Sequence, residues 1–114
     1  MKALYNDVIN KTLSEIDIEP SKKAYCKVLG CLVCRMDTRS ILGKKFGLVQ
    51  DAKEISISII SGNNIYNNPE LLGNFILLGL TKDRLRGLND KEIEFFMHSF
   101  CRWPDGRYVL NDID

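Results

Sequence analysis

Residues 20–36 read PSKKAYCKVLGCLVCRM, and the fold expected for the whole chain follows from them. Pro20 suits the first turn of a helix. Most of the residues after it are apolar, and the only polar face consists of a few Lys and Arg side chains. A helix that is apolar on most sides is buried. We therefore expect a central helix that runs to about Met36. Gly30 in its middle would cost about 1 kcal/mol against alanine, and a close crossing of two helices would explain its presence.

The segments that flank this helix also show helical spacing. Apolar side chains recur at intervals of three and four over residues 3–16, as in an amphipathic helix. After the central helix, Thr38 can cap a short helix over residues 39–46, which Gly47 would end. These two segments are predicted to pack against the central helix.

Residues 52–61 fit two structures. Asp51 and Glu54 make a capping box, which favours a helix that Gly62 would stop. The same residues alternate like a strand and are rich in β-branched side chains. A strand here would have residues 107–110 as its partner, and we expect the helix.

Two more helices are expected in the C-terminal half. Asn68 and Pro69 open a buried helix, ELLGNFILLGL, and Asn89 with Glu92 makes a second capping box that starts the last one. The expected inner stripe of the last helix consists of Ile93, Phe96, Met97, Phe100 and Cys101.

The predicted fold is therefore all-α, a compact bundle of five or six helices with room for one short C-terminal hairpin. The 114 residues fit a single domain over residues 1–114. With 45% hydrophobic and 27% charged residues, the composition is that of a globular protein, and the net charge of +1 supplies no global field. No signal peptide and no apolar run of membrane-spanning length is evident, so we expect a soluble protein in the cytoplasm that does not engage a membrane.

The cysteines match an iron–sulfur cluster motif in their spacing only. Cys26, Cys31 and Cys34, with Cys101 downstream, have the C-x4-C-x2-C…C spacing of plant-type iron–sulfur proteins. On one continuous helix Cys26 would lie about 12 Å from Cys34 along the axis, too far for three thiolates to converge. We therefore expect small buried hydrophobes, no metal and no cofactor.

Catalytic chemistry is not indicated. His98 is expected in a solvated row with Glu94 and Arg102 on the last helix, and no recognised motif places a nucleophile beside it. No glycine-rich phosphate loop is present. We expect no catalytic residues and a protein that is not an enzyme.

Residues 39–59 resemble a helix-turn-helix over part of their length. The matching residues are Leu42, Gly43, Phe46, Gly47 and Leu48. The pattern then fails, because Lys53 and Ser56 stand where the motif needs apolar residues. The second helix also lacks side chains that read base edges.

Two surfaces are candidates for binding a partner. The first comprises aromatic side chains in connecting segments and the tip of a Pro-Asp-Gly turn: Tyr66, Trp103, Asp105, Arg107 and Tyr108. The alternative is basic, since residues 20–47 hold seven Lys or Arg against one acidic residue. It comprises Lys22, Lys23, Arg39, Lys44 and Lys45.

The function expected from these features is that of a non-catalytic protein-binding module. Within this class we favour a small inhibitor or immunity-type protein that neutralises a partner protein such as a toxin. A viral or phage antagonist of a host factor fits the same features, and abundant Ile and Asn hint at an AT-rich gene. The competing class is a nucleic-acid-binding regulator that uses residues 39–59.

Overall fold

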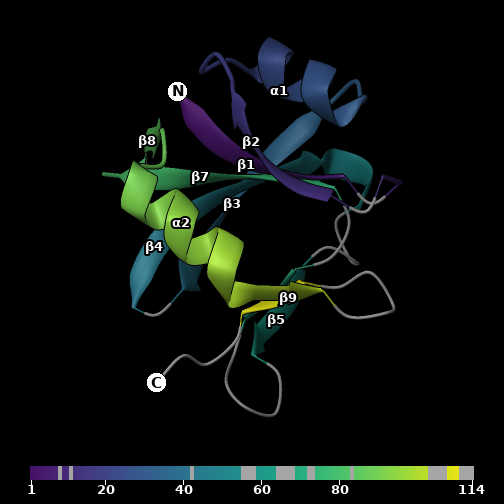
Figure 1. Ribbon diagram of the computed structural model, residues 1–114. Helices are drawn as coiled ribbons and strands as arrows, with labels where there is room; N and C mark the ends of the chain where they lie inside the picture. The colour runs from purple at the N-terminus through teal and green to yellow at the C-terminus, as the bar shows by residue number, and fades with distance from the viewer. Residues whose placement is uncertain are drawn as a thin grey trace.

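The chain is built mainly from antiparallel β-strands, in a computed structural model that describes residues 1–7, 9–10, 12–41, 43–54, 59–63, 69–71, 74–82, 84–102 and 108–110 (Figure 1). The prediction of an all-α bundle is wrong, because these residues hold two α-helices among ten strands. None of the described helices has the length and apolarity that crossing a bilayer requires.

The larger sheet has six strands, all paired antiparallel. They are β1 (Lys2–Asp7), β2 (Thr12–Asp17), β3 (Cys34–Ile41), β4 (Lys44–Asp51), β7 (Phe75–Thr81) and β8 (Arg84–Arg86). Their order is β2-β1-β7-β4-β3, with β8 also paired to β7. The two α-helices are α1 (Lys22–Leu29) and α2 (Asp90–Ser99).

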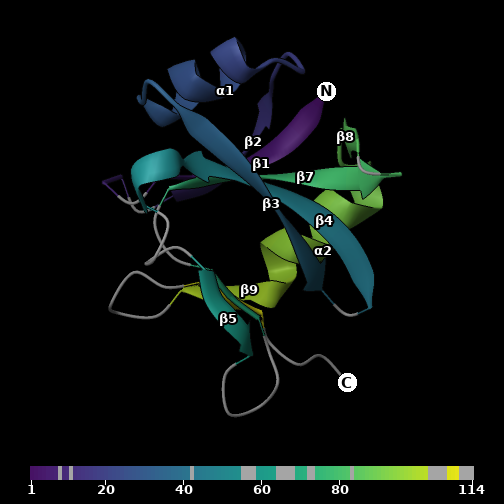
Figure 2. The same cartoon turned by 180° about the vertical axis from the view of Figure 1, so that it is seen from behind.

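Apolar side chains cover both faces of this sheet. Along β7, Phe75 and Leu77 join the cluster beneath α2, whereas Ile76 and Leu78 join the cluster beneath α1. Figures 1 and 2 show α2 lying across one side of the strands, with α1 above them. A strand buried on both faces reads as a continuous apolar run, and this explains why FILLGL was predicted to be helical.

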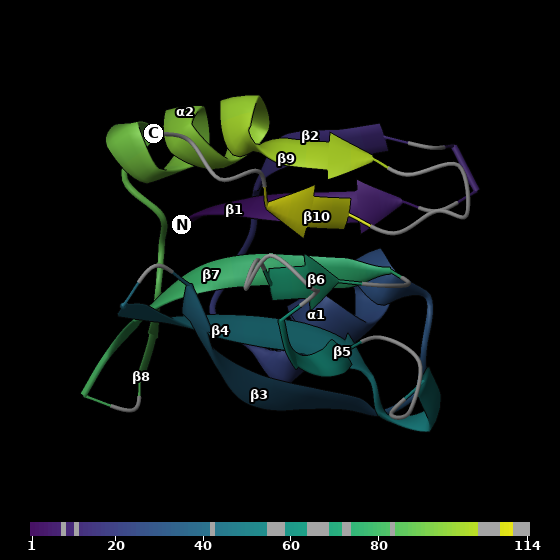
Figure 3. The same ribbon diagram turned by 90° about the horizontal axis from the view of Figure 1, so that it is seen from below.

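A smaller sheet lies beyond the end of α2 (Figure 3). Its strands are β5 (Ile59–Asn63), β6 (Pro69–Leu71), β9 (Phe100–Arg102) and β10 (Tyr108–Leu110), in the order β5-β6-β10-β9. A 3₁₀ turn, η1 (Ala52–Glu54), replaces the start of the helix expected over residues 52–61. The alternative prediction of a strand is closer to the structure, because β5 begins at Ile59. Its pairing partner is β6 and not residues 107–110.

The N-terminal segment is a β-hairpin and not the predicted amphipathic helix. Strand β1 pairs with β2 on one side and with β7 on the other. Ala3 is buried with the cluster beneath α1, and Leu4 with the cluster beneath α2. Because both faces of β1 are covered, its apolar residues do not alternate cleanly and mimic helical spacing.

The expected central helix stops seven residues early. Ser21 caps α1 by accepting a hydrogen bond from the amide of Ala24 at 3.1 Å, and the helix ends at Leu29. Gly30 has a φ of 68° and a ψ of 35°, the left-handed conformation in which helices commonly terminate. The prediction that Gly30 marks a helix crossing is therefore wrong. Residues 34–36 belong to β3 instead.

The last helix begins where the sequence predicts. The side chain of Asn89 accepts from the amide of Glu92 at 2.8 Å, and Glu92 accepts from the amide of Asn89 at 3.0 Å. This is the reciprocal geometry of a capping box. Ile93 and Phe96 are buried as expected, but Met97 is 46% exposed.

The helix-turn-helix resemblance does not correspond to helices. In the described residues, this region comprises the end of β3, the whole of β4, the turn η1 and the start of β5. Gly43 and Gly47 belong to the β3–β4 hairpin: Gly43, with a φ of 78°, lies in the turn, and Gly47 lies opposite Thr38. The structural basis for a helical DNA reader is thus absent from the described part of residues 39–59.

Candidate functional site

Two adjacent apolar side chains stand out from the surface where α1 gives way to β3. Leu32 is 94% exposed and Val33 is 63% exposed. Met36, two residues into β3, is also exposed. Among the described residues, this short segment supplies three of the five large hydrophobic side chains that are exposed. Leu32, assigned to the buried central helix from the sequence, is therefore not a core residue.

The end of α1 explains why these side chains are exposed. Gly30 turns the chain out of the helix, and the amide of Cys31 then donates to the carbonyl of Cys26 at 3.0 Å. Val33 is held at the edge of the sheet, where its carbonyl accepts from the amide of Ala52 at 2.9 Å. Both ends of the connection are fixed by the backbone, and Leu32 projects between them. We call Leu32 and Val33 the apolar ridge.

Leu32 and Val33 line two hollows. One, of about 320 Å³, is lined by Lys22, Lys23, Cys26, Cys31, Leu32, Val33 and Cys34. The other, of about 290 Å³, is lined by Gly30, Cys31, Leu32, Val33, Asp51 and Lys53. Lys22, Lys23 and Lys53 are exposed, so the rim of the ridge is mainly basic.

Three thiols gather at the base of the apolar ridge. The end of α1 brings Cys26, Cys31 and Cys34 to one hollow, where the thiol of Cys26 donates to the carbonyl of Leu32 at 3.7 Å and that of Cys34 donates to the carbonyl of Lys22 at 4.0 Å. All three cysteines are free and half-buried. The premise that the three cysteines share one continuous helix is wrong, because α1 ends at Leu29 and Cys34 opens β3. Among the described residues, no group of three or more His, Cys, Asp or Glu side chains is arranged to hold a metal ion.

The environment disfavours ionisation of two of these thiols. Burial, followed by the neighbouring thiol of Cys26, raises the pKa of Cys31 to about 11. The same two causes raise the pKa of Cys34, although Lys22 opposes the change. Cys26 is the common neighbour of both thiols.

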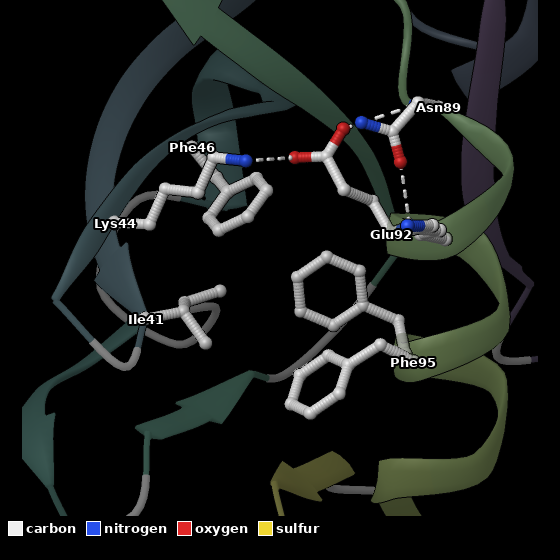
Figure 4. A pocket seen from close by; sticks show the side chains of 8 residues that line it. Ile41, Lys44, Phe46, Asn89, Glu92 and Phe95 are labelled. Atoms are coloured by element: carbon white, nitrogen blue, oxygen red, sulfur yellow. Dashed lines mark hydrogen bonds and ion pairs between the residues drawn. The ribbon is translucent and has the colours of Figure 1, made fainter.

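A third hollow, of about 330 Å³, lies away from the ridge, between the β3–β4 hairpin and α2 (Figure 4). Its apolar wall includes Ile41, Phe46 and Phe95, and Phe96 packs edge-on against Phe46 with ring centroids 5.0 Å apart. Its polar wall is formed by Lys44, Asn89, Lys91 and Glu92.

The polar wall of this pocket is occupied by internal pairing. Glu92 accepts from both guanidinium nitrogens of Arg86, from the amide of Asn89 and from Lys44 at 2.9 Å. The hydrogen bonds from Arg86, followed by those from Asn89 and Lys44, outweigh burial and lower the pKa of Glu92 to about 2. A carboxylate held this firmly in its charged form is a poor general acid or base near neutral pH. We infer that Glu92 holds α2 against the sheet.

The residues predicted for binding are distributed as follows. Tyr66, Trp103, Asp105 and Arg107 lie outside the described residues. Tyr108 opens β10, where its backbone pairs with Leu71 and Arg102.

The alternative basic set does not form one patch. Lys22 and Lys23 lie on α1 beside the start of β3, whereas Lys44 and Lys45 open β4 at the far end of β3. Eight residues of strand separate these ends by about 23 Å. Arg39 lies within β3 opposite Phe46. His98 is exposed on α2, as expected.

The sequence contains a signal for the ridge that helical periodicity obscured. Ser21 is a good N-cap and Gly30 a good helix stop, and together they delimit α1. Reading Gly30 as the stop would have placed Leu32 and Val33 in a connection.

Comparisons of the chain with protein-family models, with curated proteins and with solved structures find no match.

Proposed function

We propose that this protein is a non-catalytic protein-binding module and that the apolar ridge of Leu32 and Val33 is its binding surface. The observation that carries the proposal is the near-complete exposure of Leu32 beside an exposed Val33. Full burial of each of these side chains would contribute about 1.5–3 kcal/mol to the free energy of binding. Binding energy of this kind is typically concentrated in a few central side chains.

The chemistry of the rim supports a partner of a particular kind. Lys22 and Lys23 line one of the hollows at the apolar ridge and Lys53 lines the other. The matching surface is a protein with an apolar pocket bordered by carboxylates, because opposite charges favour encounter and fix orientation. A nucleic acid offers phosphates for the lysines but no comparable apolar pocket, so the ridge favours a protein.

Within this class, an inhibitor or immunity-type protein remains the proposal, with a viral or phage antagonist of a host factor as the alternative. A small rigid fold that presents an apolar projection suits neutralisation of a partner. We further propose a cytoplasmic location, which the three free thiols support because such compartments keep thiols reduced.

The proposal is tested by capture of partners from extracts of the native host, followed by reconstitution with the purified partner. The variants are Leu32→Asp on the ridge and Ile9→Asp as a matched control. Ile9 is 85% exposed in the β1–β2 connection. We expect the wild type and Ile9→Asp to retain the same partner and Leu32→Asp to lose at least tenfold in affinity. Equal affinity for Leu32→Asp would exclude the ridge.

Further variants separate the competing surfaces. Arg107→Ala tests the first predicted surface, the aromatic residues and the Pro-Asp-Gly turn. Lys44→Glu with Lys45→Glu tests the two lysines at the start of β4. Binding through the apolar ridge should tolerate both changes and weaken only modestly with salt, since burial of apolar surface is not screened. A complex that is abolished by the lysine pair and by raised salt would instead be electrostatic, as with a nucleic acid.

A further inference from the structure

The three thiols beside the apolar ridge have a paired geometry that the proposed binding function does not use. Cys26 and Cys31 occupy the two positions that a Schellman helix end brings into side-chain contact, on either side of left-handed Gly30. The defining hydrogen bond, from the amide of Cys31 to the carbonyl of Cys26, is 3.0 Å long. The two side chains therefore face each other through a fixed backbone motif.

Cys34 completes the arrangement from the start of β3. It lines the same hollow as Cys26 and Cys31, and its thiol donates to the carbonyl of Lys22 on α1 at 4.0 Å. The hollow is open to reagents, because its other lining residues include the exposed Lys22, Lys23 and Leu32. Cys26 thus has a thiol neighbour on each of two separate segments.

We propose that Cys26 and Cys31 are a thiol–disulfide exchange site that reacts with small disulfides of the glutathione type. The Schellman end supplies the neighbouring positions that a disulfide requires, with Cα atoms within about 7 Å. This inference concerns the thiols alone and does not depend on the ridge as a binding surface.

The reaction proceeds in two exchange steps. The thiolate of Cys26 attacks one sulfur of the small disulfide, forming a mixed disulfide and releasing one small thiolate. The thiol of Cys31 then loses its proton to solvent, and its sulfur attacks the sulfur of Cys26. The second small thiolate leaves and a Cys26–Cys31 disulfide remains. Two protein thiols are oxidised as one small disulfide is reduced to two thiols.

The environment of Cys31 makes the second step the slow one. Burial raises the pKa of Cys31, and this cause persists once Cys26 is in the mixed disulfide, so few molecules carry the attacking thiolate near neutral pH. Neighbouring Lys22 is an exposed cation that favours the anionic small disulfide at the hollow.

The test uses the full chain in a chelator, equilibrated with glutathione disulfide and then alkylated. The reduced protein carries four thiols, and we expect oxidation to leave two. Cleavage after Lys27 separates Cys26 from Cys31, so the bond should join peptide 24–27 to peptide 28–35. Dithiothreitol should restore four thiols. Retention of four thiols, or oxidation confined to mixed or intermolecular disulfides, would overturn the proposal.

Serine variants establish the pairing, because peptide 28–35 contains both Cys31 and Cys34. The bond should persist in Cys34→Ser and disappear in Cys31→Ser. Cys101→Ser is the matched control, since Cys101 lies on β9 in the other sheet, and it should form the bond as the wild type does. A bond that survives in Cys31→Ser and is lost in Cys34→Ser would contradict the assignment to Cys31.

Discussion

Arg86 and Glu92 form a two-pronged ion pair, with Nη1 2.8 Å from Oε1 and Nη2 2.9 Å from Oε2. The pair ties β8 to the first turn of α2, and Lys44 adds a link from Glu92 to β4. Glu92 also completes the capping box with Asn89. One carboxylate therefore joins the helix, its cap and two strands.

This carboxylate predicts a stability that depends on pH. The folded protein lowers the pKa of Glu92 from an ordinary value of 4.5 to about 2. A depressed carboxyl pKa stabilises the fold fully above the unfolded value, and that contribution is lost as pH falls from about 4.5 to about 2. Urea unfolding across this range should show the decline. In Glu92→Gln the decline should be shallower and stability at pH 7 lower by about 1–3 kcal/mol. Identical pH profiles for the two proteins would refute this role.

Gly79 is predicted to be required for the position of Arg86. The two residues are opposite each other on β7 and β8, and a Cβ on Gly79 would overlap the guanidinium group and side chain of Arg86. Gly79→Ala should therefore displace Arg86 and cost about 1–3 kcal/mol, as overpacking does. A double-mutant cycle provides the control: in an Arg86→Ala background the same change should cost much less. Additive costs would show that the two positions are not coupled.

The burial of Phe96 and the exposure of Leu32 predict opposite results for two similar truncations. Phe96 is 1% exposed and packs against Phe46, so Phe96→Ala should cost about 3–5 kcal/mol. Leu32 is 94% exposed, so Leu32→Ala should change stability by less than about 0.5 kcal/mol. Chemical denaturation measures both. A large loss for Leu32→Ala would mean that the apolar ridge is buried.

Local signals in the sequence survive in the structure where backbone geometry alone decides them. The Asn89–Glu92 capping box predicted the start of α2 correctly, because its hydrogen bonds lie within four residues. Pro20, predicted in the first turn of a helix, lies just before it, because Ser21 is the N-cap and α1 begins at Lys22. These features need no information about distant parts of the chain.

Long-range pairing explains the errors. Strand β7 is covered by apolar side chains on both faces, and residues such as Ile76 and Leu77 then give no alternation that identifies a strand. Its pairing with β1 joins segments about seventy residues apart, which no local pattern reveals. The placement of Leu32 was wrong for a local reason, since a helix face was assigned across the stop at Gly30.

The end of α1 at Gly30 is the feature on which both the apolar ridge and the thiol pair depend. Gly30 has a φ of 68° and no heavy atom within 4 Å of an added Cβ, so an alanine there meets no clash and only an unfavourable backbone conformation. The most direct test is the free energy of unfolding of Gly30→Ala from urea denaturation. The left-handed helix end predicts a loss of about 1 kcal/mol. A gain of about 1 kcal/mol, as expected for alanine inside a continuous helix, would contradict the account.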